Sequence, residues 1–275
     1  ALEDEFRYDG DWKPRDVYTN SSATDDVYIS STVTLSANLS VTNFEIETNQ
    51  IATINSGGSL IVSGTSSGNI TYNRNLANTD WYLVSSPVMG QDIDTFVSAE
   101  GLASGTNNNN MGLASYDNTS AAWDYYQNGT SGSGDFALGS GRSIKLAAAG
   151  DISFTGTMPV ENVSIAITSN TNGYNLVGNP YPSHISINDI INTNTASLTE
   201  GTLWIWDNYK GGYYATFNLA TPTSYISPAQ GFFVKSNGTN SLSITEAMQS
   251  HQSDSFLRLS SERPEISLVL SDGEI

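Results

Sequence analysis

Residues 25–64 carry short segments in which apolar and polar side chains alternate with a period of two. The segments are separated by two to five turn-forming residues, and each is shorter than an ordinary sandwich strand. They are Val27-Tyr28-Ile29, Val33-Thr34-Leu35, Leu39-Ser40-Val41, Phe44-Glu45-Ile46, Ile51-Ala52-Thr53-Ile54 and residues 57–64. The spacing favours stacked rungs of a parallel β-solenoid; the alternative is an antiparallel meander, for which an Asn-Gly or Asp-Gly hairpin signal is lacking. We expect residues 1–68 to form a polar lead-in and solenoid-like rungs.

After residue 68 the pattern of apolar positions occurs twice, which indicates a tandem repeat. Four positions match at an offset of 93 residues: Trp81 with Tyr174, Leu83 with Leu176, Val84 with Val177, and Pro87 with Pro180. Two segments match at an offset of 90 residues: 113–118 with 203–208, and 141–145 with 231–235. A net loss of three residues in a loop explains the changed offset. The copies open with Ile70-Thr71-Tyr72 and Val163-Ser164-Ile165.

β-branched and aromatic residues punctuated by Gly, Asn and Ser predict an all-β fold, and no helical periodicity is sustained. Single helical turns are the most that residues 93–97 and 185–191 support. We expect a short β-solenoid-like N-terminal region followed by two tandem homologous β-sandwich-like units, at residues 69–161 and 162–250. Residues 251–275 are expected to form a linker and the start of a further strand region.

The chain contains 28 acidic and 10 basic residues, a formal net charge of −18. Nucleic acid and anionic membranes are poor partners for such a surface, because basic residues bind both. No apolar run is long enough to span a bilayer, so membrane insertion is not expected. Cysteine is absent, which excludes disulfides and thiolate metal sites. Because residues 1–5 lack a basic or apolar targeting pattern, we expect a signal peptide to be absent or already removed.

Three segments of the second copy are specific enough to suggest a family: residues 174–182, 203–207 and 226–234. With their Asn-Leu-Val-Gly-Asn-Pro-Tyr-Pro string, they resemble a repeat module of surface proteins exported by the type IX secretion system, found before the C-terminal sorting domain. The resemblance covers about residues 69–272, although the first copy has Ser85-Ser86 and Val88 where the string has Gly-Asn and Tyr. It implies an extracellular or cell-surface module of adhesins or enzyme accessories, and it implies no reaction.

The Asn179-Pro180-Tyr181-Pro182 segment reads as a structural motif. Its two prolines fix φ and push the preceding residues toward extended conformations, which suits a rigid turn at a strand end. A ligand site at this turn is the alternative.

Calcium is the cofactor that the acidic composition suggests, because hard cations take several carboxylate or carbonyl oxygens. The candidate ligands are Asp9, Asp11, Asp92 and Asp94, none of which has the spacing of a recognised calcium loop. Asp117 and Asp207 follow aromatic strands and are expected to close Asx turns.

Catalytic chemistry has little support in the sequence. His184 and His251 are the only histidines, and no nucleophile elbow or phosphate-binding loop occurs. Two carboxylates would suffice for a hydrolase, but the copies differ at most acidic positions and offer no obvious pair. We therefore expect no enzyme activity.

The second copy concentrates aromatic residues around the turn at residues 207–212. Alternation places Trp204 and Trp206 on one face of a strand and Leu203 and Ile205 on the other. The first copy has Tyr116 and Trp123 opposite Trp206 and Tyr213, which predicts a shared core. It has Ala114 and Asp124 opposite Trp204 and Tyr214, which predicts that these two are dispensable to the fold. Trp204, Tyr209 and Tyr214 are therefore the candidate ligand-binding residues, with packing specific to the second copy as the alternative.

Together these features predict a non-catalytic structural or adhesive module of a secreted or cell-surface bacterial protein. Its partner is expected to be a polysaccharide or another surface protein. The alternative is a carbohydrate-binding module accessory to a polysaccharide-degrading enzyme. Aromatic content alone does not separate them, because a sugar platform and a sandwich core both use Trp and Tyr.

Overall fold

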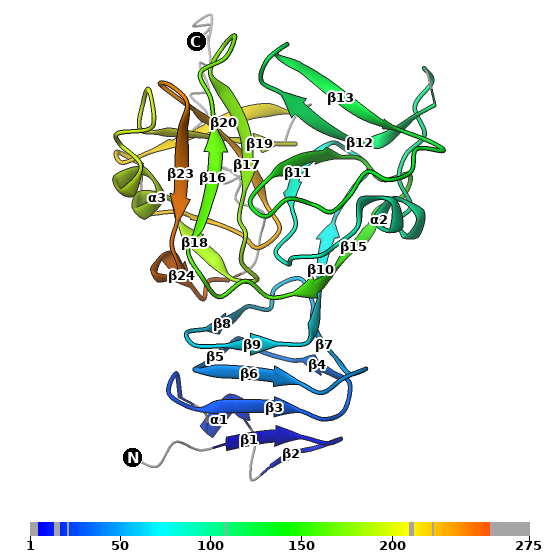
Figure 1. Cartoon of the computed structure of the whole chain (residues 1–275), viewed down its shortest axis with the longest axis vertical. Helices are drawn as coiled ribbons and strands as arrows, with labels where there is room; N and C mark the ends of the chain where they lie inside the picture. The colour runs from blue at the N-terminus through cyan, green and yellow to red at the C-terminus, as the bar shows by residue number, and fades with distance from the viewer. Residues whose placement is uncertain are drawn as a thin grey trace, which may run out of the picture.

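The computed structural model describes residues 5–13, 17–20, 22–107, 109–208, 212–221 and 223–253. The all-β fold with a solenoid-like N-terminal region is confirmed. Figure 1 shows a stack of short strands at the N-terminal end, on which two larger β units stand side by side. The further strand region expected within residues 251–275 lies outside the described residues from residue 254 onward.

The stack is built from strands that form three walls and pair in parallel, except for β2, which pairs antiparallel with β1. One wall has the strand order β2-β1-β3-β6-β9, the second contains β4, β7 and β10, and the third is the pair β5-β8. Their bounds are β1 (Glu5–Tyr8), β2 (Trp12–Lys13), β3 (Asp26–Ile29), β4 (Val33–Leu35), β5 (Leu39–Val41), β6 (Asn43–Ile46), β7 (Ile51–Ile54), β8 (Leu60–Val62), β9 (Ser66–Ser67) and β10 (Asn69–Leu76), with a short α1 (Val17–Asn20). The alternating pattern places apolar side chains inside, as at Leu39 and Val41 on either side of the partly exposed Ser40.

The first β unit grows directly out of the stack. β10 pairs in parallel with β7 on one side and antiparallel with β15 on the other, so one sheet belongs to both regions. The other sheet has the order β11-β14-β12-β13. Its elements are β11 (Tyr82–Ser85), α2 (Ile93–Ala99), β12 (Asn110–Asp117), β13 (Ala122–Gln127), β14 (Gly141–Ile144) and β15 (Gly150–Thr157). Stack and first unit consequently share one apolar core.

The second unit has its own core and repeats the same plan. Its main sheet has the order β17-β22-β19-β20, and β16 pairs with β23. The bounds are β16 (Val163–Ile167), β17 (Tyr174–Gly178), β18 (His184–Ser186), α3 (Ile187–Thr193), β19 (Thr202–Asp207), β20 (Tyr213–Asn218), β21 (Tyr225–Ile226), β22 (Gly231–Lys235), β23 (Asn240–Ile244), the 3-10 turn η2 (Glu246–Met248) and β24 (Gln249–Ser250). The two segments expected to form single helical turns form two-turn helices instead. Asp92 caps α2 and Ser186 caps α3.

The main sheets of the two units agree in strand order and in register at their centre. Leu83 pairs with Ser143 on β11 and β14, and Leu176 pairs with Phe233 on β17 and β22, as the repeat alignment predicts. The alignment is wrong at the opening strands: Tyr72 pairs with Phe154, but Ile165 pairs with Leu242, a register two residues away from the expected one. A shift of two keeps the same side chains inward, which is why the apolar pattern does not reveal it.

The two units meet about a pseudo-twofold axis. Val84 forms an antiparallel bridge with Gln230, and Ser140 forms one with Val177. Because Val84 is equivalent to Val177 and Ser140 to Gln230, the second bridge is the first with the two units exchanged. Two backbone hydrogen bonds repeat the exchange: the Ser85 N–H donates to the Ala229 carbonyl at 3.1 Å, and the Gly178 N–H donates to the Gly139 carbonyl at 2.8 Å. Such reciprocal contacts define an isologous interface.

The second unit is also tied to the stack. The Leu60 N–H on β8 donates to the Pro182 carbonyl at 2.9 Å. The His251 ring lies between two serines of the stack, with Nε2 2.8 Å from Ser40 Oγ and Nδ1 2.9 Å from Ser59 Oγ. Residues about 200 positions apart in sequence thus hold the second unit on the end of the stack.

Candidate functional site: an aromatic seam between the units

A separate apolar cluster fills the seam between the two main sheets. Its buried members are Leu83, Leu176 and Phe233. Five partly buried aromatic side chains pack against them: Tyr116, Trp123, Tyr174, Trp204 and Trp206. The cluster is therefore incompletely covered, in contrast to the interiors of the two units.

Strand alternation explains how these rings reach the seam. On β19, Leu203 and Ile205 point into the core of the second unit, whereas Trp204 and Trp206 point the other way. The sequence prediction for this strand is confirmed. On the neighbouring β20, Tyr214 is 42% exposed and lies at the rim of the seam.

The larger of two pockets in the seam, which we call the aromatic box, has a volume of about 360 Å³. All of its lining residues are aromatic: Tyr116, Trp123, Tyr174, Trp204, Tyr214 and Phe233. The rings of Tyr116, Trp123, Tyr174 and Tyr214 stand at 80° to 87° to the Phe233 ring, with centroids 5.1 to 6.4 Å from it. Phe233 thus forms the floor, and the other four rings are upright around it.

A second pocket, which we call the twin pocket, has a volume of about 330 Å³. It is lined by Trp81, Leu83, Trp123, Tyr125, Ser143, Trp206 and Tyr214. The pseudo-twofold axis exchanges it with the aromatic box, because Trp81 is equivalent to Tyr174, Trp206 to Tyr116, and Ser143 to Phe233. Trp123 and Tyr214 line both pockets and separate them.

A lysine lies beside an aromatic ring of each pocket. Lys145 Nζ is 5.9 Å from the Trp81 ring centroid, and Lys235 Nζ is 5.5 Å from that of Tyr174. These are equivalent positions of the repeat, and both contacts lie within cation–π range. Lys235 Nζ is also 3.7 Å from a Glu200 carboxylate oxygen.

The Tyr214 hydroxyl of the box is held in the neutral form. Burial, with a smaller effect of Tyr116, raises the pKa of Tyr214 to about 12. The Tyr116 hydroxyl accepts a hydrogen bond from Asn172 Nδ2 at 2.8 Å. The box therefore presents aromatic rings and few polar atoms.

The structure brings together Trp204 and Tyr214 of the predicted ligand-binding set in the aromatic box. Tyr209 lies outside the described residues. One predicted equivalence is wrong: Trp123 pairs with Tyr116 and Tyr214 pairs with Trp206, so Tyr214, and not Tyr213, corresponds to Trp123. The second hairpin is one residue longer, which a constant offset does not anticipate. Tyr214 therefore occupies a position that is aromatic in both copies.

Sequence reasoning missed the other box residues because they come from both units. Tyr116, Trp123, Tyr174 and Phe233 were matched to positions of the repeat or assigned to a core. The usable signal was the alternation itself: on β12 and β19 the aromatic positions fall on the face opposite the unit's own core.

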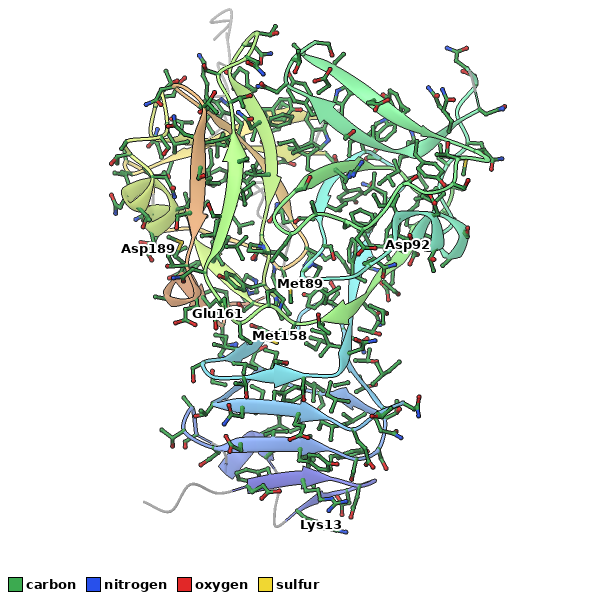
Figure 2. The ribbon with its side chains drawn as sticks, in the orientation of Figure 1. Lys13, Met89, Asp92, Met158, Glu161 and Asp189 are labelled. Carbon is green, nitrogen blue, oxygen red and sulfur yellow. The ribbon has the colours of Figure 1, made fainter. Side chains whose placement is uncertain are left out.

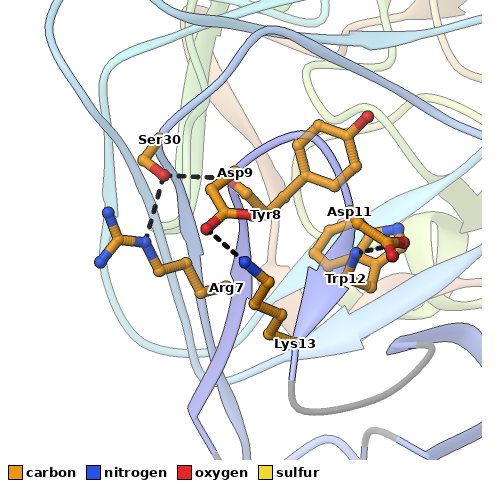
Figure 3. Close-up of polar contacts among 7 residues, drawn as sticks. All are labelled: Arg7, Tyr8, Asp9, Asp11, Trp12, Lys13 and Ser30. Carbon is orange, nitrogen blue, oxygen red and sulfur yellow. Dashed lines mark hydrogen bonds and ion pairs between the residues drawn. The ribbon is translucent and has the colours of Figure 1, made fainter.

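The calcium candidates already have other partners. Asp9 accepts a hydrogen bond from Lys13 Nζ at 2.7 Å, which lowers the pKa of its carboxyl, and Asp11 Oδ1 accepts one from the Trp12 N–H at 2.9 Å (Figure 3). Asp92 lies beside α2 in Figure 2, and its Oδ1 accepts from the Thr95 N–H at 2.7 Å as the helix cap. Calcium binding stays a prediction.

Asp94, the last of these candidates, accepts hydrogen bonds from the Tyr126 hydroxyl at 2.8 Å and the Ser133 N–H at 3.2 Å. Hydrogen bonds from Ser133 and then Tyr126 lower the pKa of the Asp94 carboxyl. Over the described residues, no group of three or more His, Cys, Asp or Glu side chains is placed to hold a metal ion. Asp117 accepts from the Thr119 N–H at 2.8 Å, as in an Asx turn.

The Asn179-Pro180-Tyr181-Pro182 motif is engaged in internal contacts. The buried Asn179 amide nitrogen donates to the carbonyl of Ser183 at 2.7 Å, and its oxygen accepts from the Tyr181 N–H at 3.0 Å. The Tyr181 hydroxyl donates to the carbonyls of Glu161 and Ile244, at 2.8 and 3.1 Å. Burial raises the pKa of Tyr181. These contacts suit a rigid turn.

The fold and seam define a class: an all-β protein in which a solenoid-like stack carries two pseudo-symmetric β units. The chain belongs to the family described as Domain of unknown function (DUF8693), whose model matches residues 16–220. The match includes most of the stack, the whole first unit and the second unit as far as β20. No curated protein and no solved structure matches the chain. Among the helices that the structure describes, none has the length and apolar character needed to span a membrane.

Proposed function

We propose that the chain is a non-catalytic structural and adhesive module of a secreted or cell-surface bacterial protein, and that it holds its partner through the aromatic seam. The observation that carries this proposal is the aromatic box, an open pocket of about 360 Å³ lined by six aromatic side chains. Its volume falls within the range of about 300–1,000 Å³ that is typical of binding sites.

The position of the box supports a binding role over simple packing. Trp123 is only partly buried and Tyr214 is 42% exposed, so both rings keep part of their surface in water beside the other aromatic rings of the seam. Exposed apolar groups gathered in one place mark interaction sites more often than singly scattered ones do. An extracellular location is supported by the resemblance to modules of type IX secreted proteins and by a sequence rich in Ser, Thr and Asn.

A binding array tests the proposal. The purified chain is applied to immobilised glycans and extracellular matrix proteins, beside Trp123→Ala, which removes a wall of both pockets. Trp12→Ala is the control, because Trp12 packs against Tyr8 at the far end of the stack. We expect array signals that Trp123→Ala loses and Trp12→Ala retains, with both variants folded by circular dichroism. Absence of any signal, or signals unaffected by Trp123→Ala, would refute the proposal.

Carbohydrate binding is the second candidate, and the twin pocket favours it. There the Ser143 side chain replaces the aromatic floor, so that tryptophan rings and a hydroxyl line the same cavity. Sugars are recognised by such combinations of aromatic faces and hydrogen-bonding groups. Retardation in polysaccharide affinity gels is the measurement. Retardation that disappears with Trp81→Ala supports this candidate, and unchanged migration on every polysaccharide argues against it.

A further inference from the structure

We propose that the aromatic box binds a trimethylammonium group, the cationic head of a choline-type compound. This proposal rests on the box being a binding site, as in the proposed function, and it adds the chemistry of the ligand.

The ring arrangement carries the first step. The faces of aromatic rings are electronegative, and cations bind over them. Phe233 provides the floor, and four rings stand nearly perpendicular to it on its sides, at angles of 80° to 87°. Trp204, which also lines the box, packs against Tyr174 at an interplanar angle of 82° and supports that wall. A compact cation inside such a box contacts several rings at once.

The scarcity of polar groups then selects the kind of cation. A primary ammonium is strongly hydrated and needs three hydrogen-bond acceptors when it leaves water. Among the residues that the structure describes, no carboxylate lines the box, and the polar side-chain atoms of its lining belong to tyrosine hydroxyls and tryptophan N–H groups. A trimethylammonium group has no N–H donors to satisfy, and its methyl groups also gain from burial against apolar walls.

Charge favours a cation over a neutral group of the same shape. The chain carries a net charge of −18, which concentrates cations near its surface. The two pockets already use this chemistry, since Lys145 lies over the Trp81 ring of the twin pocket and Lys235 lies over the Tyr174 ring of the box. Lys235 is at the edge of the box and is partly neutralised by Glu200, so it is expected to weaken the binding of a second cation modestly.

The twin pocket supplies the internal control. It has Ser143 in place of the Phe233 floor, and Ala114 at the position of Trp204. Without the floor ring, it surrounds a cation less completely. Trimethylammonium binding should therefore depend on the box and not on its twin.

The experiment compares choline with 3,3-dimethylbutan-1-ol, its uncharged isostere, by titration calorimetry and by proton NMR of the ligand methyl groups. Ring currents should move the choline methyl resonance upfield, and choline should bind about tenfold more tightly than the alcohol. Equal affinities, or no upfield shift, would overturn the proposal.

Matched variants locate the site. Tyr174→Leu removes a wall of the box, and Trp81→Leu removes the equivalent wall of the twin pocket. We expect Tyr174→Leu to weaken choline binding about tenfold and Trp81→Leu to leave it within about twofold. Tyr116→Leu, on the other unit, provides a second box variant if Tyr174→Leu fails to fold. Equal effects of box and twin variants would contradict the assignment.

Two further arms test the charge and the source of the ligand. Lys235→Gln should tighten choline binding and leave the affinity for the alcohol unchanged; weaker choline binding would contradict the cationic role of the ligand. Sedimentation with phosphatidylcholine vesicles distinguishes the two sources of the ligand: binding to the vesicles indicates a lipid headgroup, and absence of binding indicates a free choline compound. Vesicle binding supports the proposal only if free choline competes with it. If choline fails to bind while array signals still depend on Trp123, the ligand chemistry is wrong and the adhesive function stands.

Discussion

The turn that follows β11 in the first unit differs from the turn that follows β17 in the second, although the two strands are equivalent. In the second unit, the buried Asn179 amide donates to the carbonyls of Ser183, Ile226 and Ser227. In the first unit, Ser86 only closes its own turn, donating to the Val88 carbonyl at 2.8 Å. Both turns are buried, so burial alone does not explain the additional hydrogen bonds of the second.

The difference follows from how each unit is attached to the stack. The first unit shares β10 with the stack, so strand pairing holds it in place. None of the described strands of the second unit lies in the stack, and its turn provides a direct link through the Pro182 carbonyl and the Leu60 N–H. The rigid turn at residues 179–182 therefore fixes the attachment of the second unit to the stack, a role that the pairing of β10 with β7 has in the first unit.

Asn179→Ala should have the largest effect on this comparison. It removes the hydrogen bonds to three carbonyl groups, of which that of Ser227 keeps the Gln230 N–H as a donor, and it removes the acceptor of the Tyr181 N–H. We expect it to lower the free energy of unfolding by about 3 kcal/mol. Ser86→Ala should cost about 1 kcal/mol. Chemical denaturation measures both changes in the free energy of unfolding. Equal changes would show that the two turns contribute equally to stability.

The meeting point of the units gives a second prediction. A Cβ on Gly178 would lie 2.2 Å from the Cβ of Ser85, its equivalent across the pseudo-twofold axis, so only one of the two positions can carry a side chain. We expect Gly178→Ser to destabilise the protein by about 2 kcal/mol, as overpacking does. Ser85→Gly should cost about 1 kcal/mol, because glycine is unfavourable within a strand. The double exchange, measured by the same unfolding curves, should recover part of the loss of Gly178→Ser.

Much of this arrangement could be predicted from local patterns. Alternation predicted the stack and the two faces of β19, and the offsets predicted the equivalence of Leu83 with Leu176 and of Gly141 with Gly231. Those features depend on the period of side-chain direction, which sequence records directly.

The seam could not be predicted in the same way. It depends on a pseudo-twofold packing of two surfaces, and neither surface carries a sequence signal for the other. The second hairpin has one more residue between Trp206 and Tyr214 than the first has between Tyr116 and Trp123, so Tyr214 is the ring that faces the seam. The repeat offset, taken from the neighbouring strands, does not include this insertion.

The smallest effect that we predict concerns pH and the second attachment point of the second unit. Burial lowers the pKa of His251 below its ordinary value of about 6.5. The unfolded chain therefore binds more protons in the window below pH 6.5, and stability that is complete above about pH 6.5 is lost as pH falls toward the folded-state pKa. Unfolding curves between pH 7.5 and 5 should show this loss, and His251→Gln should reduce it.

The control is the difference between the wild-type and His251→Gln profiles. Glu100 responds in the opposite sense, because burial raises the pKa of its carboxyl and favours the protonated folded form at low pH. Subtraction of the profiles removes that contribution. A difference that does not change between pH 7.5 and 5 would mean that the His251 contact with Ser40 and Ser59 does not respond to protonation.

The reciprocal bridges Val84 to Gln230 and Ser140 to Val177 have a genetic consequence. In a dimer of identical subunits, one gene segment specifies both sides of a twofold interface, so its two symmetry-related pockets mutate together. Joining the halves in one chain keeps them at a high effective concentration and lets each half vary alone. Phe233 and Ser143 show that independence, because equivalent positions of the two units carry an aromatic ring in one pocket and a hydroxyl in the other.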